Sequence, residues 1–265
     1  MTALSRPLAQ LWRHRELIAL LVERDLKVRY KRSVLGMGWT LLNPLLQMLV
    51  YTLVFSNIMR IGVPQFPVFL LSGLLPWSLI SISITGASPS LLNNQGLIRK
   101  VAVPQMVYPM AVVASKLVDF VLSLAPLAVI AAALGRAPGV PWLALAPAVL
   151  LAALFATGLA LLFSSLTVFY RDMRHLTDIL IQVWFYMTPV IYPADLVSQL
   201  PHAWMRAVLL ANPATPVVRL FQVAIYERHF PPAALFGAAS AAAALVLALG
   251  VAVFVRHEDE HIHHF

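Results

Sequence analysis

Long apolar segments recur along the whole chain, each interrupted by only a few polar residues. Six of them are close to the length that an α-helix needs to cross a hydrocarbon core of roughly 30 Å at about 1.5 Å per residue. The pattern predicts an all-α integral membrane protein with six transmembrane helices, of which the fifth is barely long enough. The predicted spans are residues 37–59, 68–92, 107–134, 142–168, 176–192 and 233–255.

The segment between the fifth and sixth spans has a different character. Residues 204–225 are apolar overall, but Arg206, Asn212-Pro213, Pro216 and Arg219 interrupt them. A helix that faces lipid along its whole length tolerates such residues poorly. We therefore predict re-entrant or interfacial helices in this region, and a seventh span is the alternative.

The first 35 residues are the charged part of the chain. Apolar residues recur there at nearly helical spacing, opposite a basic face. This pattern predicts an N-terminal amphipathic helix in the headgroup plane; the alternative is a cytoplasmic helix packed on its own protein. We expect one membrane domain over residues 1–265, made of this segment (1–35), a six-span bundle (36–255) and a cytoplasmic tail (256–265).

Composition supports a membrane location. Hydrophobic residues make up 60% of the chain and charged residues 11%, whereas soluble domains carry about 25% charged residues. The absence of cysteine excludes disulfides, thiolate nucleophiles and Cys-based zinc sites. The net charge of +8 is attributed to membrane topology, not to binding of nucleic acid.

Lys and Arg are distributed unevenly between the two predicted sides of the membrane. The side with both termini carries thirteen, and the other side carries five in loops of comparable length. Cytoplasmic loops are enriched in these residues. We therefore predict a multi-pass protein with both termini in the cytoplasm.

The sequence offers little catalytic chemistry. It contains no Gly-x-x-x-x-Gly-Lys-Ser/Thr phosphate loop, so any energy from ATP has to come from a partner chain. We find no Ser-His-Asp arrangement or catalytic carboxylate pair, and predict no catalytic, cofactor-binding or metal-binding residues. The histidine-rich tail, 257–264, matches no compact set of metal ligands, and we expect it to be solvated.

Ionisable residues inside predicted spans are costly and therefore informative. Lys116 and Asp119 lie three residues apart on one face of the third span. They could form a proton or ion relay, but we favour a structural pair because a proton-driven transporter usually needs more buried carboxylates.

Aromatic residues concentrate in and around the first, fourth and fifth spans. At span ends such residues usually form interfacial belts, but Tyr51, Trp184 and Tyr186 fall well inside. They could fill the core, or stack on sugar rings while offering an O–H or N–H group. The sequence leaves these two possibilities open.

Several motifs occur together and in one order along the chain. Residues 24–36 read RDLKVRYKRSVLG and are followed by Trp39 and Asn43-Pro44; residues 97–104 read LIRKVAVP; Tyr170-Arg171-Asp172 and Asn212-Pro213 come later. This set resembles the permeases of polysaccharide-exporting ABC transporters, the ABC type 2 exporters of O-antigen, capsule and teichoic acid. The resemblance extends over most of the chain.

The resemblance implies a homodimer in the inner membrane with two P-loop ATPase subunits, which bind ATP and Mg. It also implies re-entrant helices near the exit of the path, at about residues 194–210. Because the first and fifth spans line the path in this family, the expected channel-lining residues are Trp39, Tyr51, Phe55, Trp184 and Tyr186. The loop after the second span would form the ATPase-coupling helix, with Gln95, Gly96, Leu97, Ile98, Arg99, Lys100 and Val101.

Two physical arguments agree with this resemblance. Apolar Leu97, Ile98 and Val101 flank Arg99-Lys100, and a short amphipathic helix of this kind can fit a groove on a partner. The N-terminal basic residues could bind the diphosphate of a lipid-linked glycan, although attraction to lipid headgroups would produce the same charges. The basic residues in question are Arg24, Lys27, Arg29, Lys31 and Arg32.

Three other functions remain as alternatives. An ion-coupled carrier would depend on a proton gradient and need no ATPase, and the Lys116/Asp119 pair alone supports it. An intramembrane enzyme acting on polyprenyl phosphates would need clustered Asp or His in the cytoplasmic loops between spans, where the sequence has none. An ABC exporter of a drug or a small lipid would share the architecture. Membrane lipids are expected to surround the chain in every case.

Overall fold

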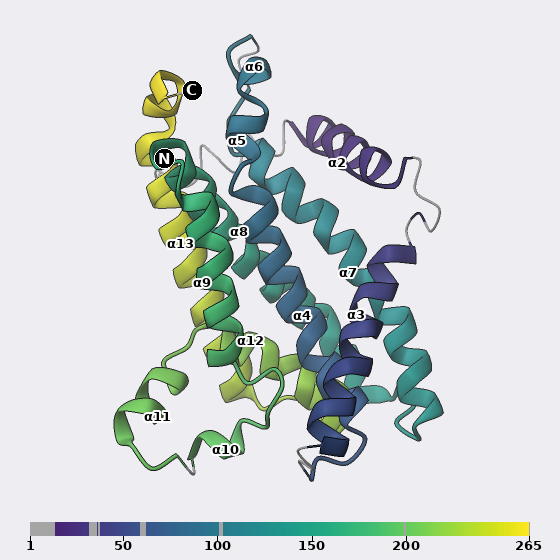
Figure 1. Cartoon of the computed structure of the whole chain (residues 1–265). Coiled ribbons are helices and arrows are strands. Elements are labelled where there is room, and N and C mark those ends of the chain that lie inside the picture. Colours follow the sequence, from purple (N-terminus) through teal and green to yellow (C-terminus); the bar gives the residue numbers. More distant parts are fainter. Residues whose placement is uncertain are drawn as a thin grey trace.

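The computed structural model describes residues 14–31, 36, 38–58, 62–100, 103–198 and 200–264. Every regular element within them is a helix, and the long helices run side by side with shorter ones at both ends of the bundle (Figure 1). The prediction of an all-α membrane protein is confirmed. The first part of the predicted amphipathic segment, residues 1–13, lies outside the described residues, as do Arg32 and Val101.

Four helical segments are long and apolar enough to cross a membrane. They are α4 (Phe66–Ala87), α7 (Val107–Ala133), α8 (Leu145–Phe169) with the preceding 3-10 turn η2 (Val140–Ala144), and α13 (Ala233–His264). These correspond to the predicted second, third, fourth and sixth spans. A fifth span results if α11 (Ala203–Leu210) is joined to the segment Ala214–Glu227 across a 70° bend.

The predicted first and fifth spans correspond to shorter helices. The first is α3 (Gly38–Tyr51), which continues as a π-helix, η1 (Thr52–Ile58), and has its apolar part at Leu42–Ser56. The fifth is α9 (Met173–Met187), whose 15 residues reach only about 22 Å. Neither apolar stretch is long enough alone, so the count of six spans stays a prediction.

Helices α8 and α13 pack with their backbones almost in contact. A Cβ atom added at Gly158 of α8 would lie 2.6 Å from the carbonyl oxygen of Val246, and one at Gly250 would lie 2.7 Å from the carbonyl carbon of Gly158. Small residues allow this approach, which gives van der Waals contact where lipid offers no hydrophobic drive for association.

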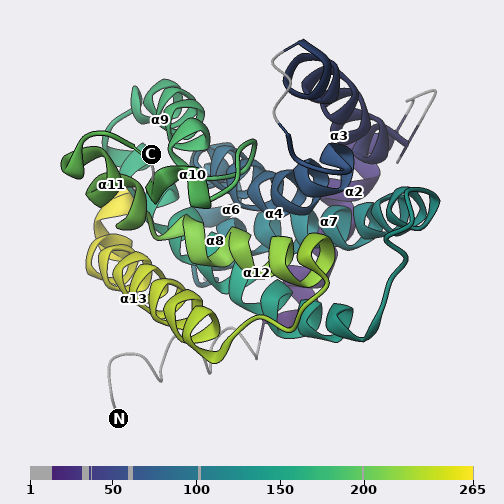
Figure 2. The same ribbon diagram turned by 90° about the horizontal axis from the view of Figure 1, so that it is seen from below.

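Helix α4 lies in the middle of the bundle, and most of its apolar stretch is buried. Helices α9 and α3 lie on either side of it, as seen from the side in Figure 1 and from below in Figure 2. Because α3 and α9 are the outer members of this set, their polar faces are available to form a site.

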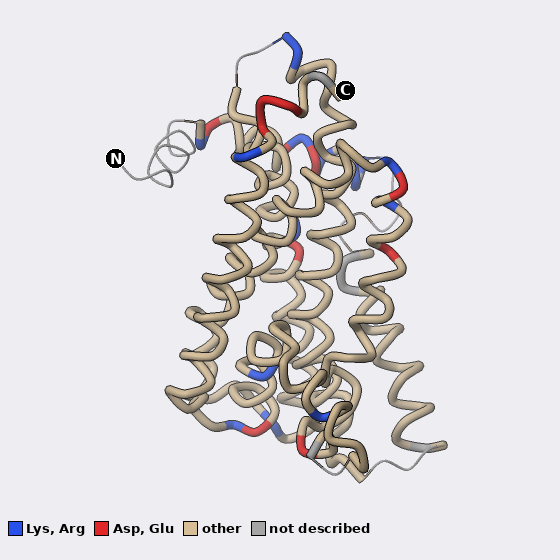
Figure 3. The backbone as a smooth tube through the Cα atoms, turned by 90° about the vertical axis from the view of Figure 1, so that its left-hand side faces the viewer, with Lys and Arg blue, Asp and Glu red and all other residues tan. Residues whose placement is uncertain are grey.

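The two ends of the bundle differ in their short helices and in their charge. One end carries α2 (Arg15–Tyr30), α5 (Ser90–Asn93), α6 (Gln95–Ile98) and the end of α13 (Figure 1). Lys and Arg gather there (Figure 3), and we call it the basic end. The opposite end carries α10 (Asp195–Ser198), α11, α12 (Ala214–Phe221) and the π-helix η3 (Gln222–Glu227).

The prediction of a solvated tail is wrong for the described part of that tail. Helix α13 continues to His264, and the side chain of His261 is fully buried. The spacing of His257, His261 and His264 places all three rings around Phe169 of α8, with centroid distances of 5.3, 5.5 and 4.9 Å. The tail is helical and packed because these three positions share one face of the helix. We expected a solvated tail because charged residues are frequent in this segment.

Candidate functional site

An open groove of about 360 Å³ runs between α3 and α9, with α4 as its floor. We call it the α3–α9 groove. Its lining combines amide, hydroxyl and carboxylate groups with aromatic rings. The lining residues are Asn43, Gln47 and Tyr51 of α3; Leu74, Trp77, Ser78, Ser81 and Ile82 of α4; and Asp178, Ile181, Gln182, Phe185 and Tyr186 of α9.

The groove is polar because two of its helices carry polar residues at intervals of four. On α3 these are Asn43, Gln47 and Tyr51. On α9 they are Asp178, Gln182 and Tyr186. Successive members lie about 40° apart around a helix of 3.6 residues per turn, so each set forms one continuous stripe. Both stripes face the groove.

This lining suits a hydroxyl-rich ligand. Amide side chains both donate and accept hydrogen bonds, and the carboxylate of Asp178 accepts them. Tyr51 and Tyr186 add ring faces with a polar tip, which can contact the apolar face of a sugar ring. The groove therefore has the chemistry to hold sugar residues in a largely apolar bundle.

An array of aromatic rings supports the wall of the groove. Tyr51 stacks on Phe185 at a centroid distance of 6.3 Å, and Phe185 lies 5.8 Å from Trp77. Trp77 meets Trp184 edge-on at 5.6 Å. Tyr51 and Phe185 therefore link α3 to α9, and the two tryptophans fix α9 against α4.

The five predicted channel-lining residues have different positions. Tyr51 and Tyr186 line the groove. Trp184 instead points into the bundle, where its indole Nε1 donates to Asn212 Oδ1 at 2.8 Å. Phe55 packs against Phe66 with ring centroids 6.1 Å apart. Trp39 is 51% exposed and lines a neighbouring pocket.

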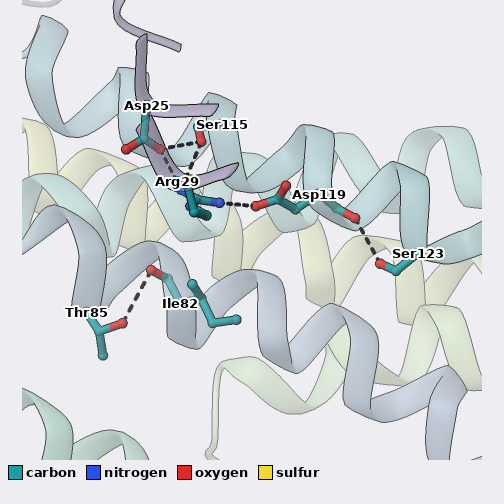
Figure 4. Close-up of polar contacts among 7 residues, drawn as sticks. All are labelled: Asp25, Arg29, Ile82, Thr85, Ser115, Asp119 and Ser123. Carbon is teal, nitrogen blue, oxygen red and sulfur yellow. Dashed lines mark hydrogen bonds and ion pairs between the residues drawn. The ribbon is translucent and has the colours of Figure 1, made fainter. Parts of the chain in front are cut away.

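That neighbouring pocket lies between α3, α4 and α7 and contains both Lys116 and Asp119. We predicted that these two residues form a structural pair. The structure adds a partner, because the carboxylate of Asp119 accepts from Arg29 of α2 (Figure 4). The sequence could not supply this partner, since Arg29 lies 90 residues away along the chain.

Arg29 belongs to a polar cluster that fixes α2 on α7 (Figure 4). Its Nη2 donates to Asp25 at 2.5 Å, and Ser115 Oγ donates to the same carboxylate oxygen at 2.5 Å. Arg29 was predicted to bind a lipid diphosphate, but here two carboxylates already surround its guanidinium group. One face of α2 therefore packs on the protein, as the alternative prediction for this helix stated. Another face remains exposed, as a helix in the headgroup plane requires.

The exposed face of α2 carries three of the other predicted diphosphate residues. Arg24, Lys27 and Lys31 line a shallow depression together with Leu20, Glu23 and Val28. Lys27 forms an ion pair with Glu23. The hydrogen bond from Lys27, together with its positive charge, holds the pKa of Glu23 below its ordinary value. Arg32 lies outside the described residues.

The predicted coupling helix is a short segment at the basic end, formed by α5 and α6. Gln95, Gly96, Leu97, Arg99 and Lys100 are exposed there. Ile98 is only 7% exposed, because it packs in a cluster with Leu21, Leu91 and Met106. Ile98 is therefore unavailable to a partner, and Leu97, at 39% exposure, is the apolar residue that remains.

Three residues anchor the segment 88–105 to the rest of the bundle. At its start, Ser88 Oγ lies 2.7 Å from Thr167 Oγ1 of α8. Asn94 Oδ1 accepts from Arg24 of α2 at 3.2 Å.

At the end of the segment, Gln105 joins the end of α13. Its backbone N–H donates to Glu258 Oε1 at 3.0 Å, and its Nε2 donates to the Glu258 carbonyl at 2.9 Å. Gln105 Oε1 also lies 3.0 Å from His261 Nδ1. A displacement of the coupling segment would thus act on α2, α8 and α13 together.

Our sequence interpretation missed several groove residues, including Asn43, Gln47, Asp178 and Gln182. Asn43 was interpreted only as part of an Asn-Pro motif. The available signal was the four-residue spacing of polar groups within apolar spans. No group of three or more His, Asp or Glu side chains suited to a metal occurs within the described part of the chain.

Comparison with known proteins agrees with this architecture. Residues 16–226 match the sequence family described as ABC-2 type transporter, and the chain belongs to that family. An O-antigen export system permease protein, RfbA, from Myxococcus xanthus is 36% identical over 96% of this chain and 97% of that protein. The RfbA protein of Klebsiella pneumoniae is 32% identical over 69% of this chain and 71% of its own length. The polysialic acid transport protein KpsM of Escherichia coli is 24% identical over 89% of this chain and 91% of its own.

Proposed function

We propose that this chain is the membrane permease subunit of an ATP-driven exporter that moves a lipid-linked polysaccharide out of the cytoplasm. The similarity to an O-antigen export permease over almost the full length of both chains carries this proposal. The lining of the α3–α9 groove supports it independently, because amides, hydroxyls and aromatic rings are the groups that bind sugars.

A second copy of the chain would complete the path. The α3–α9 groove is open along one side, and polar groups such as Asp178 and Gln182 are exposed there. Ionisable groups at membrane depth normally face the interior of a bundle or a water-filled cavity. We infer that two grooves face each other across a homodimer and enclose the path between them.

The motor would bind at the basic end. The exposed coupling residues there provide a small apolar contact, Leu97, beside the cations Arg99 and Lys100. Two ATPase subunits with bound ATP and Mg would move this segment, and its three anchors would pass the displacement to α2, α8 and α13. The excess of Lys and Arg at this end supports a cytoplasmic location for it, and with it an inner-membrane protein with both termini in the cytoplasm.

The exposed face of α2 is the proposed contact for the diphosphate of the lipid-linked substrate. Arg24, Lys27 and Lys31 share that face, whereas Arg29 is engaged with carboxylates. The same engagement weakens the alternative of an ion-coupled carrier. Asp119, the intramembrane carboxylate on which that alternative depended, forms an ion pair with Arg29 that holds α2 on α7.

The proposal is tested by purifying the tagged chain from its native membranes in mild detergent and identifying its partners. We expect a stoichiometric P-loop ATPase. The substitution Leu97→Gln should reduce the ATPase that copurifies, whereas Leu196→Gln on α10, a leucine of similar exposure (42%) at the opposite end, should not. A homomer without an ATPase, under conditions that preserve other membrane complexes, would contradict the proposal.

A further inference from the structure

The α3–α9 groove has an unusual balance of charge. Among the described residues that line it, Asp178 is the only charged one, and no Lys, Arg or His contributes to the lining. Asp178 is exposed and makes no ion pair or hydrogen bond with another described residue. An unneutralised carboxylate therefore faces the space through which a ligand would pass.

Within the described part of the chain, three basic side chains on α9 and neighbouring elements form no ion pair with this carboxylate. Arg174 lies one turn before Asp178 on α9, toward the basic end, and does not line the groove. Lys116 lines the neighbouring pocket, which shares Asn43, Gln47, Ser78 and Ile82 with the groove, but it is not among the lining residues of the groove itself. Arg219, on α12, is paired with Glu227 at 2.8 Å. The groove therefore presents a negative potential, which low-dielectric walls strengthen.

We propose that the α3–α9 groove selects glycans without net negative charge and that Asp178 is the specificity-determining residue. This inference rests on the proposed export function. An uncharged sugar can donate its hydroxyls to the Asp178 carboxylate, exchange hydrogen bonds with Gln182 and Asn43, and lay its ring against Tyr51 or Tyr186.

A glycan that carries a carboxylate or phosphate in every repeat meets the opposite situation. Each repeat would bring its anion beside Asp178, and the described residues of the lining offer no cation to compensate. Like charges placed together in this way oppose binding strongly. In a homodimer with two facing grooves, two copies of Asp178 would act on the same polymer.

The test compares two lipid-linked glycans that share one lipid carrier, of which the first has only neutral sugars and the second has one uronic acid in each repeat. Each is made in cells that contain the complete transporter, and the glycan that reaches the surface is quantified. We expect the wild-type chain to export the neutral glycan at least about tenfold more efficiently than the acidic glycan. The readout is this ratio, so an equal loss of export for both glycans does not affect it.

Variants at the groove should move the ratio in a defined direction. Asp178→Asn removes the anion, and Gln182→Lys adds a cation one turn away. Each variant should bring the ratio of neutral to acidic export toward one. Gln182→Glu should increase it. Asp259→Asn, which removes an exposed carboxylate at the end of α13, is the matched control and should leave the ratio unchanged.

The outcomes separate the two proposals. If the wild-type chain exports neither glycan while a control exporter in the same cells does, the export function is wrong. If it exports both equally, or if neither Asp178→Asn nor Gln182→Lys changes the ratio although both proteins reach the membrane folded, the assignment of Asp178 is wrong.

Discussion

Trp184 of α9 donates its indole N–H to the side-chain oxygen of Asn212, 2.8 Å away, in the bend between α11 and α12. The same oxygen accepts from the backbone N–H of Ala214 at 3.0 Å. The amide nitrogen of Asn212 donates to the carbonyl of Met187 at 3.1 Å and to Thr188 Oγ1 at 2.9 Å. One buried amide thus joins the end of α9, beside the groove, to the start of α12.

This arrangement predicts that Asn212 matters more to folding than its partner Trp184 does. Asn212→Ala removes four hydrogen bonds and leaves buried donors without partners, and should lower the free energy of unfolding by roughly 2–4 kcal/mol. Trp184→Phe leaves the contact of Asn212 with Ala214 in place and should cost less. Unfolding in mixed micelles would measure both variants and their double mutant. Equal effects of the two single substitutions would contradict the assignment.

The close approach of α8 and α13 predicts a sharp difference between two glycines of the same helix. Gly250→Ala would force its new methyl group into the backbone of Gly158, and overpacking of this kind typically costs about 1–3 kcal/mol. Gly237→Ala is the matched control, because a Cβ atom there meets nothing within 4 Å. Thermal unfolding in detergent should show a lower midpoint for Gly250→Ala only. A similar midpoint for both would mean that the helices are farther apart.

The cluster around Arg29 predicts that two basic residues of α2 differ in their effect on stability. Arg29→Met leaves Asp25 and Asp119 without their shared cation and should destabilise the docking of α2 by roughly 1–3 kcal/mol. Lys27→Met breaks only an exposed ion pair and should cost less than about 1 kcal/mol. Hydrogen exchange of the α2 amides would report the difference. Unchanged protection in Arg29→Met would show that the cluster does not hold α2 in place.

The contacts of His261 predict that the end of α13 stabilises the chain just after the coupling segment. Gln105 Nε2 donates to the carbonyl of Glu258, so Gln105 Oε1 is the atom that accepts from His261 Nδ1–H. His261 Nε2 then accepts from Ser165 Oγ at 2.9 Å. His261→Ala removes both bonds.

Backbone amides at residues 105–108 should then exchange with solvent about tenfold faster, as expected for the loss of about 1.4 kcal/mol of local stability. Glu260→Ala, at an exposed position one residue earlier, is the control. Faster exchange in both variants would indicate general fraying of α13 instead of a specific role for His261.

Features that depend on local pattern could be predicted from the sequence. The apolar runs that became α4, α7, α8 and α13 were predicted within a few residues, apart from the extension of α13. Long apolar segments form helices in lipid regardless of their neighbours, since their backbone groups have no other partners there. The gathering of Lys and Arg at one end also follows from composition and from the alternation of spans.

The sequence by itself therefore determined the class of the protein, its helices and the charge of its two ends, because each of these depends on residues close together in the chain. Only the tertiary structure decided that Asp119 pairs with Arg29, that Ile98 is buried beside Leu21, and that Tyr186, not Trp184, faces the groove. The physical reason is that the rotation of each helix about its axis is set by packing against neighbours distant in the sequence. A helical pattern shows which residues share a face, but not what that face will meet.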